Sequence, residues 1–79
     1  SEMFIRDRIT LDMDIHQSVL LSIDVYDISG HFIEKINRGH VNTGNQSFQW
    51  SGNYSPSGMY FFKITDGDIV QIRKAVLLK

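Results

Sequence analysis

The chain has 79 residues, of which 42% are hydrophobic and 22% are charged, and its formal net charge is -1. Its eight basic and nine acidic side chains give no electrostatic footprint for nucleic acid or for an anionic membrane surface. It has no cysteine, which excludes disulfides and cysteine-ligated metal sites, and no apolar run exceeds four residues, which is too short to span a bilayer. So short a chain leaves little material for a deep catalytic cavity. We therefore predict a single domain over residues 1–79 that acts in binding, sorting or structure rather than as an enzyme.

The first part of the chain alternates apolar and polar residues, a pattern typical of strands with one buried face. Two such runs end at Ile15 and at Tyr26, and a short strand is expected over residues 32–36, after a turn at residues 27–30. Helical spacing is not sustained, and the β-branched and aromatic residues of these runs favour strands. The predicted inward positions of the first two runs are Ile5, Ile9, Leu11, Met13, Ile15, Val19, Leu21, Ile23 and Val25.

The second half of the chain continues the alternation and adds turn signals. Further strands are expected around Phe48 and Trp50, from residue 59 to 65, and from residue 69 to 78. Residues 42–45 and 55–58 are expected to be loops, because glycine accepts positive φ and proline presets φ. Asp66-Gly67 is a signal for a two-residue hairpin. Six or seven short strands at intervals of about 8–12 residues predict an all-β fold, an antiparallel β-sandwich.

Side chains that could carry chemistry are present but do not form a recognisable site. His16, His31 and His40 lie near strand ends or loops with no short ligand spacing between them, so we interpret them as solvated histidines. Asp12 and Asp14 share one strand face, but a calcium ion takes about six to eight oxygen ligands. The segment 66–68 (DGD) resembles a fragment of a calcium loop without its downstream ligands, and a hairpin turn explains it. We therefore predict no catalytic residue, no cofactor and no metal site.

The aromatic residues allow either core packing or a platform for carbohydrate. Trp50, Tyr60 and Phe62 share an inward parity, whereas Tyr54 and Phe61 lie in a loop or on the other phase. Buried aromatic rings contribute strongly to the packing of a small core. Packing is therefore the favoured interpretation, and a modest exposed aromatic patch stays open.

The final run differs from the others because residues 75–78 (AVLL) are apolar on both strand faces, with basic residues on either side. On pattern alone, a last strand buried on both sides or covered by a loop is favoured. An exposed strand of this kind would be an aggregation hazard unless another protein uses it, and a terminal strand is an easy element to pair. Recognition by a partner therefore stays open.

At this point the chain resembles the C-terminal sorting domain, or Por secretion tail, of cargo proteins of the bacterial type IX secretion system. The resemblance covers about residues 9–79 and rests on an ordered set of short segments. These segments are residues 19–30 (VLLSIDVYDISG), 43–44 (TG), 48–50 (FQW), 57–64 (SGMYFFKI) and 73–79 (RKAVLLK).

The resemblance implies a seven-stranded Ig-like sandwich at the end of a longer secreted protein of Bacteroidota. It implies a cargo domain upstream in the same chain, which is carried through the periplasm and across the outer membrane to the cell surface or medium. The implied partners are the outer-membrane machinery of type IX secretion and a sortase-like peptidase, which commonly removes such a domain.

The resemblance also assigns roles to individual positions. The matching motif positions, which we expect to maintain the fold, are Tyr26, Asp27, Gly30, Trp50, Gly58 and Tyr60. The positions that match the terminal sorting signal are Lys74, Ala75, Val76, Leu77, Leu78 and Lys79. Two departures are that residues 1–6 contain no Asn-Pro segment before the first strand, and that His31 stands where the family commonly has arginine or lysine.

Physical arguments give the same residues structural tasks. Gly58 would supply a backbone conformation that other residues adopt at a cost, and Tyr60 can bury its ring while its hydroxyl meets a hydrogen-bond partner. Asp27 can bond local amides across the turn to Gly30. The runner-up functions are an Ig-like structural assembly module, similar to that of flagellar hook-capping proteins, and a carbohydrate-binding module.

Overall fold

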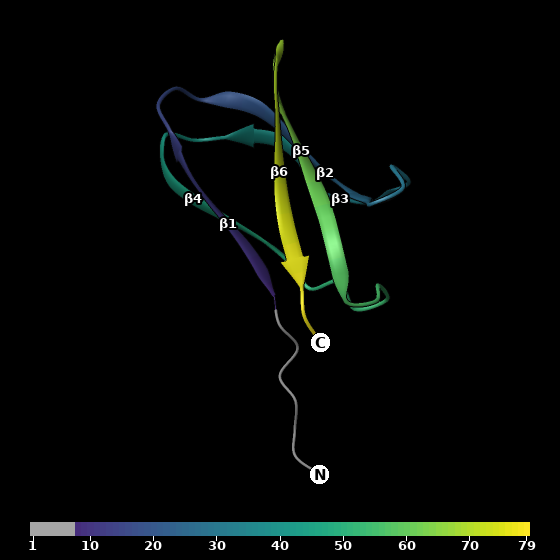
Figure 1. Ribbon diagram of the computed structural model, residues 1–79. Helices are drawn as coiled ribbons and strands as arrows, with labels where there is room; N and C mark the ends of the chain where they lie inside the picture. The colour runs from purple at the N-terminus through teal and green to yellow at the C-terminus, as the bar shows by residue number, and fades with distance from the viewer. Residues whose placement is uncertain (1–7) are drawn as a thin grey trace.

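A computed structural model describes residues 8–79, which form six β-strands (Figure 1). The strands are β1 (Ile9–Ile15), β2 (Val19–Asp27), β3 (Phe32–Val41), β4 (Gly44–Trp50), β5 (Gly58–Asp66) and β6 (Ile69–Leu77). They form two antiparallel sheets, one of order β1-β4 and one of order β3-β2-β5-β6. The predicted all-β antiparallel sandwich is confirmed, with six strands in the described part of the chain rather than about seven. The predicted strand position Ile5 lies outside the described residues.

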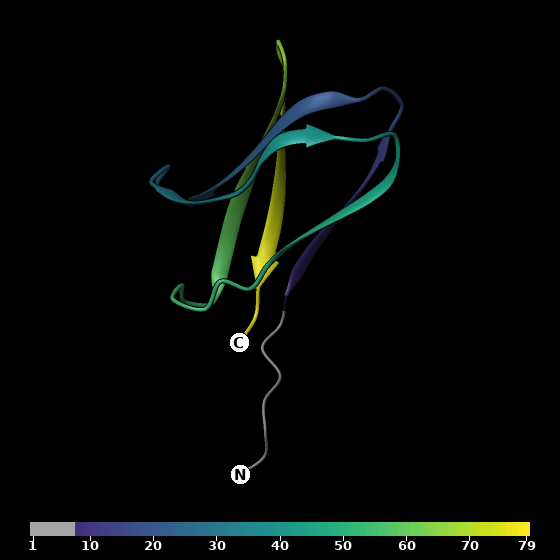
Figure 2. The same cartoon turned by 180° about the vertical axis from the view of Figure 1, so that it is seen from behind.

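The two sheets face each other and enclose the core between them (Figures 1 and 2). The alternation predicted from the sequence determines which side chains face inward, because successive residues of a strand point to opposite faces. The central strands β2 and β5 contribute most of the fully covered side chains. The buried hydrophobic residues are Leu11, Ile15, Leu21, Ile23, Val25, Val41, Trp50, Tyr60, Phe62, Ile64 and Leu77. Burying a side chain of this size contributes about 1.5–3 kcal/mol, so these residues account for much of the stability of the sandwich.

Strands β3 and β4 extend beyond their predicted limits. Strand β3 continues past residue 36 to Val41, and its polar second half pairs with β2 up to Val19. The side chain of Asn37 donates a hydrogen bond to the carbonyl of Leu21 at 2.9 Å. Strand β4 begins at Gly44, inside the segment predicted as a loop. Pairing with neighbouring strands therefore extends both strands where the sequence lacks an apolar alternation.

The hairpin between β5 and β6 turns one residue later than predicted. Asp66 and Ile69 are the last paired residues, so the turn consists of Gly67 and Asp68 rather than Asp66 and Gly67. Gly67 has a φ of +57°, and among residues 8–79 positive φ values occur only at glycine. Glycine with positive φ at the first central position is typical of a type II′ turn, whose twist matches that of the paired strands. Glycine placement therefore determines the turn.

Strands β1 and β6 lie on the same side of the sandwich but in different sheets. The start of β1 lies near the end of β6, and the two strands diverge toward the opposite end of the molecule, as both views show (Figures 1 and 2). Between residues 8 and 79, no helix is long and apolar enough to cross a membrane.

Candidate recognition surface at the C-terminal strand

The last residues of the chain alternate between buried and exposed positions. Leu77, the final residue of β6, has no solvent exposure, and Ala75 packs partly against the core. By contrast, Val76 is 58% exposed and Leu78 is 61% exposed. The interpretation of residues 75–78 as a segment buried on both faces is therefore wrong, because only one face of β6 meets the opposite sheet.

Leu77 is held at the base of the sandwich by strand β5 and by the loop between β4 and β5. It pairs with Gly58 of β5, and the backbone of Gly52 packs directly against it. A Cβ atom built on Gly52 would lie 2.6 Å from Cδ2 of Leu77 and 3.3 Å from two ring atoms of Trp50, and Gly52 has a φ of +61°. Glycine is thus required at this position both for space and for backbone conformation.

Lys79 is anchored by the loop between β4 and β5. Its backbone amide donates a hydrogen bond to Oγ of Ser57 at 3.0 Å, and its Nζ donates one to the carbonyl of Asn53 at 3.1 Å. The ion pairs found within residues 8–79 join Asp27 to His31 and Asp24 to Lys35, so neither neutralises the Lys79 ammonium. The two hydrogen bonds therefore place the Lys79 ammonium beside the loop between β4 and β5.

The exposed terminal residues share a surface with part of β5. Val76 lies opposite Met59 in the β5–β6 register, and both side chains are exposed. Lys74 and Leu78 lie two residues on either side of Val76, so the strand alternation places them toward the same face. We call Met59, Lys74, Val76 and Leu78, together with the adjoining Lys79 whose ammonium turns to the β4–β5 loop, the terminal patch. It combines apolar side chains with two positive charges.

The aromatic motif residues lie inside the sandwich. The ring of Trp50 meets the rings of Tyr60 and Phe62 edge-on, with centroid separations of 4.9 and 5.9 Å. The indole Nε1 of Trp50 donates a hydrogen bond to Oε1 of Glu34 at 2.9 Å. Tyr54 is fully exposed and isolated from this cluster. The described aromatic residues therefore favour packing over a carbohydrate platform.

Tyr60 and Gly58 shape the entry to β5. The buried Tyr60 donates a hydrogen bond from its hydroxyl to the carbonyl of Pro56 at 2.6 Å, an arrangement similar to the tyrosine corner of Ig-type sandwiches. Gly58 has a φ of +155°, a backbone conformation that residues other than glycine rarely adopt. Both residues act on the fold, because they fix the loop that contacts the end of the chain.

The turn after β2 is organised by Asp27. Its Oδ1 accepts hydrogen bonds from the amides of Ser29 and His31, both at 2.9 Å, and its carbonyl accepts one from the amide of Gly30 at 3.0 Å. The hydrogen bond from the backbone amide of His31 is the main cause that lowers the pKa of Asp27 below its ordinary value of 3.8. Desolvation partly opposes this shift, and the hydrogen bond from the amide of Ser29 adds to it. Tyr26 stacks edge-on with Phe32 across the same turn, with ring centroids 5.9 Å apart.

We expect Asp27→Asn to reduce the loss of stability that acid causes. A carboxyl whose pKa is lowered by folding stabilises the native state fully above its unfolded pKa, and this contribution is lost as pH falls through the folded-state pKa. Urea unfolding at about pH 7 and about pH 3 measures the difference, with Asp68→Asn as a control for an exposed turn carboxylate. An acid-induced change in Asp27→Asn equal to that of the original chain would contradict this role.

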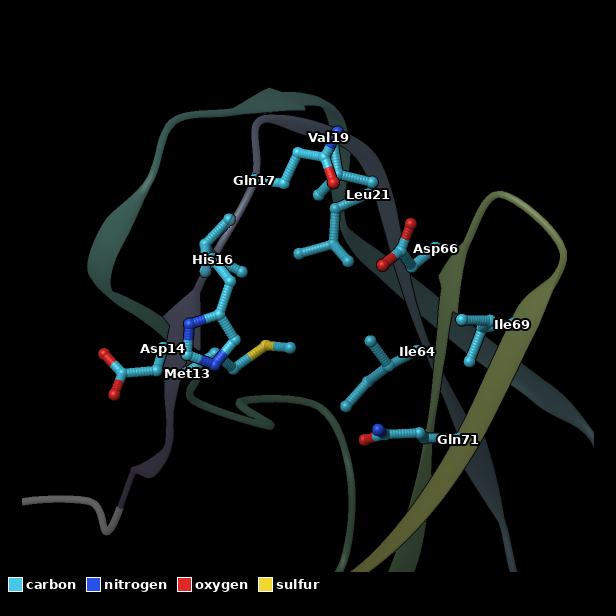
Figure 3. Close-up of a pocket in the computed structure, with 11 residues that line it drawn as sticks. Met13, Asp14, His16, Gln17, Val19, Leu21, Ile64, Asp66, Ile69 and Gln71 are labelled. Atoms are coloured by element: carbon cyan, nitrogen blue, oxygen red, sulfur yellow. The ribbon is translucent and has the colours of Figure 1, made fainter.

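A groove opens between the sheets on the side of β1 and β6 (Figure 3). Leu21 and Ile64 form its apolar floor, and the carboxylates of Asp14 and Asp66 lie on opposite sides of it. His16 also lines the groove, but no group of three His, Asp or Glu side chains able to hold a metal ion occurs in the described range 8–79. The groove thus combines an apolar floor with two carboxylates and an imidazole along its sides.

These features define the chain as a small antiparallel β-sandwich module with an exposed, basic C-terminal strand. A protein-family model described as a secretion system C-terminal sorting domain matches residues 5–78. The chain therefore belongs to this family, whose members are sorting-signal domains of type IX secretion and are generally non-catalytic. Membership implies export out of the cell and a cargo upstream. No curated protein and no solved structure matches the chain.

Sequence reasoning missed the residues that hold the end of the chain. Gly52, Asn53 and Ser57 contact Leu77 or Lys79, yet they belong to a loop with no periodic pattern. Met59 lies on the outer face of β5 and was not singled out. The sequence carries no local signal for this contact, because it depends on the strand register that places Met59 opposite Val76.

Proposed function

We propose that this domain directs an upstream cargo across the outer membrane, through the type IX machinery, to the cell surface or the medium. The observation that supports this most is the family match over residues 5–78 together with the exposure of the terminal patch. We further propose that residues 1–79 are one domain at the end of a longer secreted protein, and that the domain itself is not an enzyme.

The terminal patch is the surface on which we place recognition. Leu77 anchors the end of β6 in the core, and Val76 and Leu78 consequently stand outward on a fixed backbone. Apolar side chains give contact area, whereas charges mainly affect specificity and the rate of association. Lys74 and Lys79 would therefore orient the domain on the outer-membrane machinery, and a sortase-like peptidase is a second proposed partner.

The motif residues away from this patch have a different task in the proposal. Asp27, Trp50 and Tyr60 make the internal contacts described above. Their substitution should affect export through the stability of the domain rather than through direct recognition.

Fusing the chain to a secreted reporter tests the proposal. In a bacterium with a working type IX system, we expect the reporter to reach the surface with the full domain and to stay in the periplasm when residues 76–79 are deleted. Cell fractionation and surface proteolysis of intact cells measure the distribution, and a strain without the outer-membrane machinery is the control. Surface delivery of the truncated fusion, or delivery in the control strain, would contradict the proposal.

A further inference from the structure

The first six residues of β6, residues 69–74, are exposed on both faces. They include three apolar residues, Ile69, Val70 and Ile72. Val70 is 50% exposed and Ile72 is 59% exposed. Strand β6 is also the last strand of its sheet in the order β3-β2-β5-β6. An exposed apolar edge strand offers unpaired backbone groups to another chain, so this segment is suited to strand addition.

The register identifies which backbone groups face outward. Residues flanking a two-residue hairpin turn form a hydrogen-bonded pair, and such pairs alternate with non-bonded pairs along an antiparallel ladder. Asp66 and Ile69 flank the turn, so Ile69, Gln71 and Arg73 bond to β5. The amides and carbonyls of the three intervening residues, Val70, Ile72 and Lys74, therefore point to the outer edge.

Two of the other edge strands, β3 and β1, are less suited to accept a strand. The register between β2 and β3 is interrupted at two places, and such irregularities protect an edge from pairing. The exposed residues of β1 are Thr10, Asp12 and Asp14, so charge recurs along its outer face and protects that edge, whereas the charges of β6 lie together at Arg73 and Lys74 and leave residues 69–72 uncharged. The β5–β6 register, by contrast, runs without interruption from Asp66 to Gly58.

The groove of Figure 3 lies on the inner side of this edge. Ile69 and Gln71 of β6 line it on one side, Met13 of β1 lines it on the other, and Ile64 lies at its floor. A strand added beside β6 would point every second side chain toward the space between the sheets. Apolar side chains at these positions would fill the groove and cover its floor.

The charges of β6 indicate the chemistry of the added strand. Its charged residues are Arg73 and Lys74, and no acidic residue occurs between Ile69 and Leu77. These two side chains alternate between the inner and outer faces of the sheet. An added strand therefore meets Ile69, Val70 and Ile72 with one polar side chain, Gln71, between them, and positive charge on both faces at residues 73–74.

We propose that the outer edge of β6 binds an extended strand of a partner protein that is apolar along most of its length and acidic at one end. The inference rests on the proposed function, because the strand would belong to the export machinery. Backbone hydrogen bonds supply the binding, the groove selects apolar side chains, and Arg73 with Lys74 sets the position of the acidic end.

Synthetic probes test this with the full chain in solution. Two eight-residue peptides carry a Thr-Val repeat with two glutamates at the N-terminal or the C-terminal end, and matched peptides carry lysines instead. We expect one glutamate peptide to bind and to slow amide hydrogen exchange at Val70, Ile72 and Lys74. Its lysine counterpart should bind about twofold to tenfold more weakly.

Two substitutions at Ile72 separate backbone pairing from side-chain contact. Ile72→Pro removes an outward amide and leaves the β5 ladder intact, and should weaken peptide binding by about tenfold. Ile72→Thr keeps the amide and should weaken binding less than Ile72→Pro. Both variants are first checked for unchanged thermal unfolding, and Val70→Pro, which removes another outward amide, replaces Ile72→Pro if that variant does not fold.

Three outcomes would overturn the inference. They are no binding of either glutamate peptide, equal weakening by Ile72→Pro and Ile72→Thr, and concentration-dependent pairing of the chain with itself through the same amides. The last result would identify a second copy as the occupant. If any of them occurs while export still requires residues 76–79, strand addition fails and the sorting proposal stands.

Discussion

Replacing Trp50 with alanine should lower the free energy of unfolding by about 3–5 kcal/mol. A domain of this size has a total stability of about 4–12 kcal/mol, so the variant should be largely or partly unfolded. The reason is that Trp50 belongs to the smaller sheet and its ring contacts Tyr60 and Phe62 of the larger one. Loss of the indole leaves a cavity at the junction of the two layers.

Urea unfolding followed by circular dichroism measures this loss. The matched control is Trp50→Phe, which keeps an aromatic ring in the core but removes the hydrogen bond from Nε1 to Glu34. A hydrogen bond of this kind contributes about 0.5–1.5 kcal/mol, and the smaller ring adds a packing loss, so the control should be destabilised less than Trp50→Ala. A loss below about 1 kcal/mol in Trp50→Ala would mean that the two sheets do not depend on this contact.

The second large effect is expected at Leu77. Leu77→Ala should lower the free energy of unfolding by about 2–5 kcal/mol, because the side chain is fully buried against Gly52 and Trp50. The neighbouring substitution Val76→Ala should change it by less than about 1 kcal/mol, since Val76 is exposed on the other face.

Thermal or urea unfolding of the two variants side by side checks this contrast. Equal losses would contradict the alternation of β6 and, with it, the assignment of the terminal patch. The contrast also affects how deletions are interpreted. Removing residues 76–79 removes Leu77 from the core as well as the exposed side chains, so a loss of export in that deletion combines folding with recognition.

The strand pattern was largely predictable from sequence because burial on one face enforces a period of two. Inward positions such as Leu21, Ile23, Phe62 and Ile64 followed from parity alone. The second half of β3 and the start of β4 were not predictable in this way, since cross-strand pairing rather than an apolar pattern holds them.

The candidate surface was only partly predictable. The terminal run was recognisable by its composition and by its resemblance to a family of sorting domains, but its two faces looked equivalent in the sequence. Only the packing of the smaller sheet distinguishes buried Leu77 from exposed Val76 and Leu78. The anchoring of Lys79 by Asn53 and Ser57 joins segments distant in the chain, and no local pattern indicates such a contact.

The most direct test of the terminal patch is the surface delivery of a fused reporter by the double variant Val76→Thr/Leu78→Ser. Both side chains are exposed, so the variant should keep its stability within about 1 kcal/mol while losing the apolar contact area. The account predicts a folded domain whose reporter stays in the periplasm. Undiminished surface delivery by this folded variant would contradict the assignment of recognition to the exposed face of the last strand.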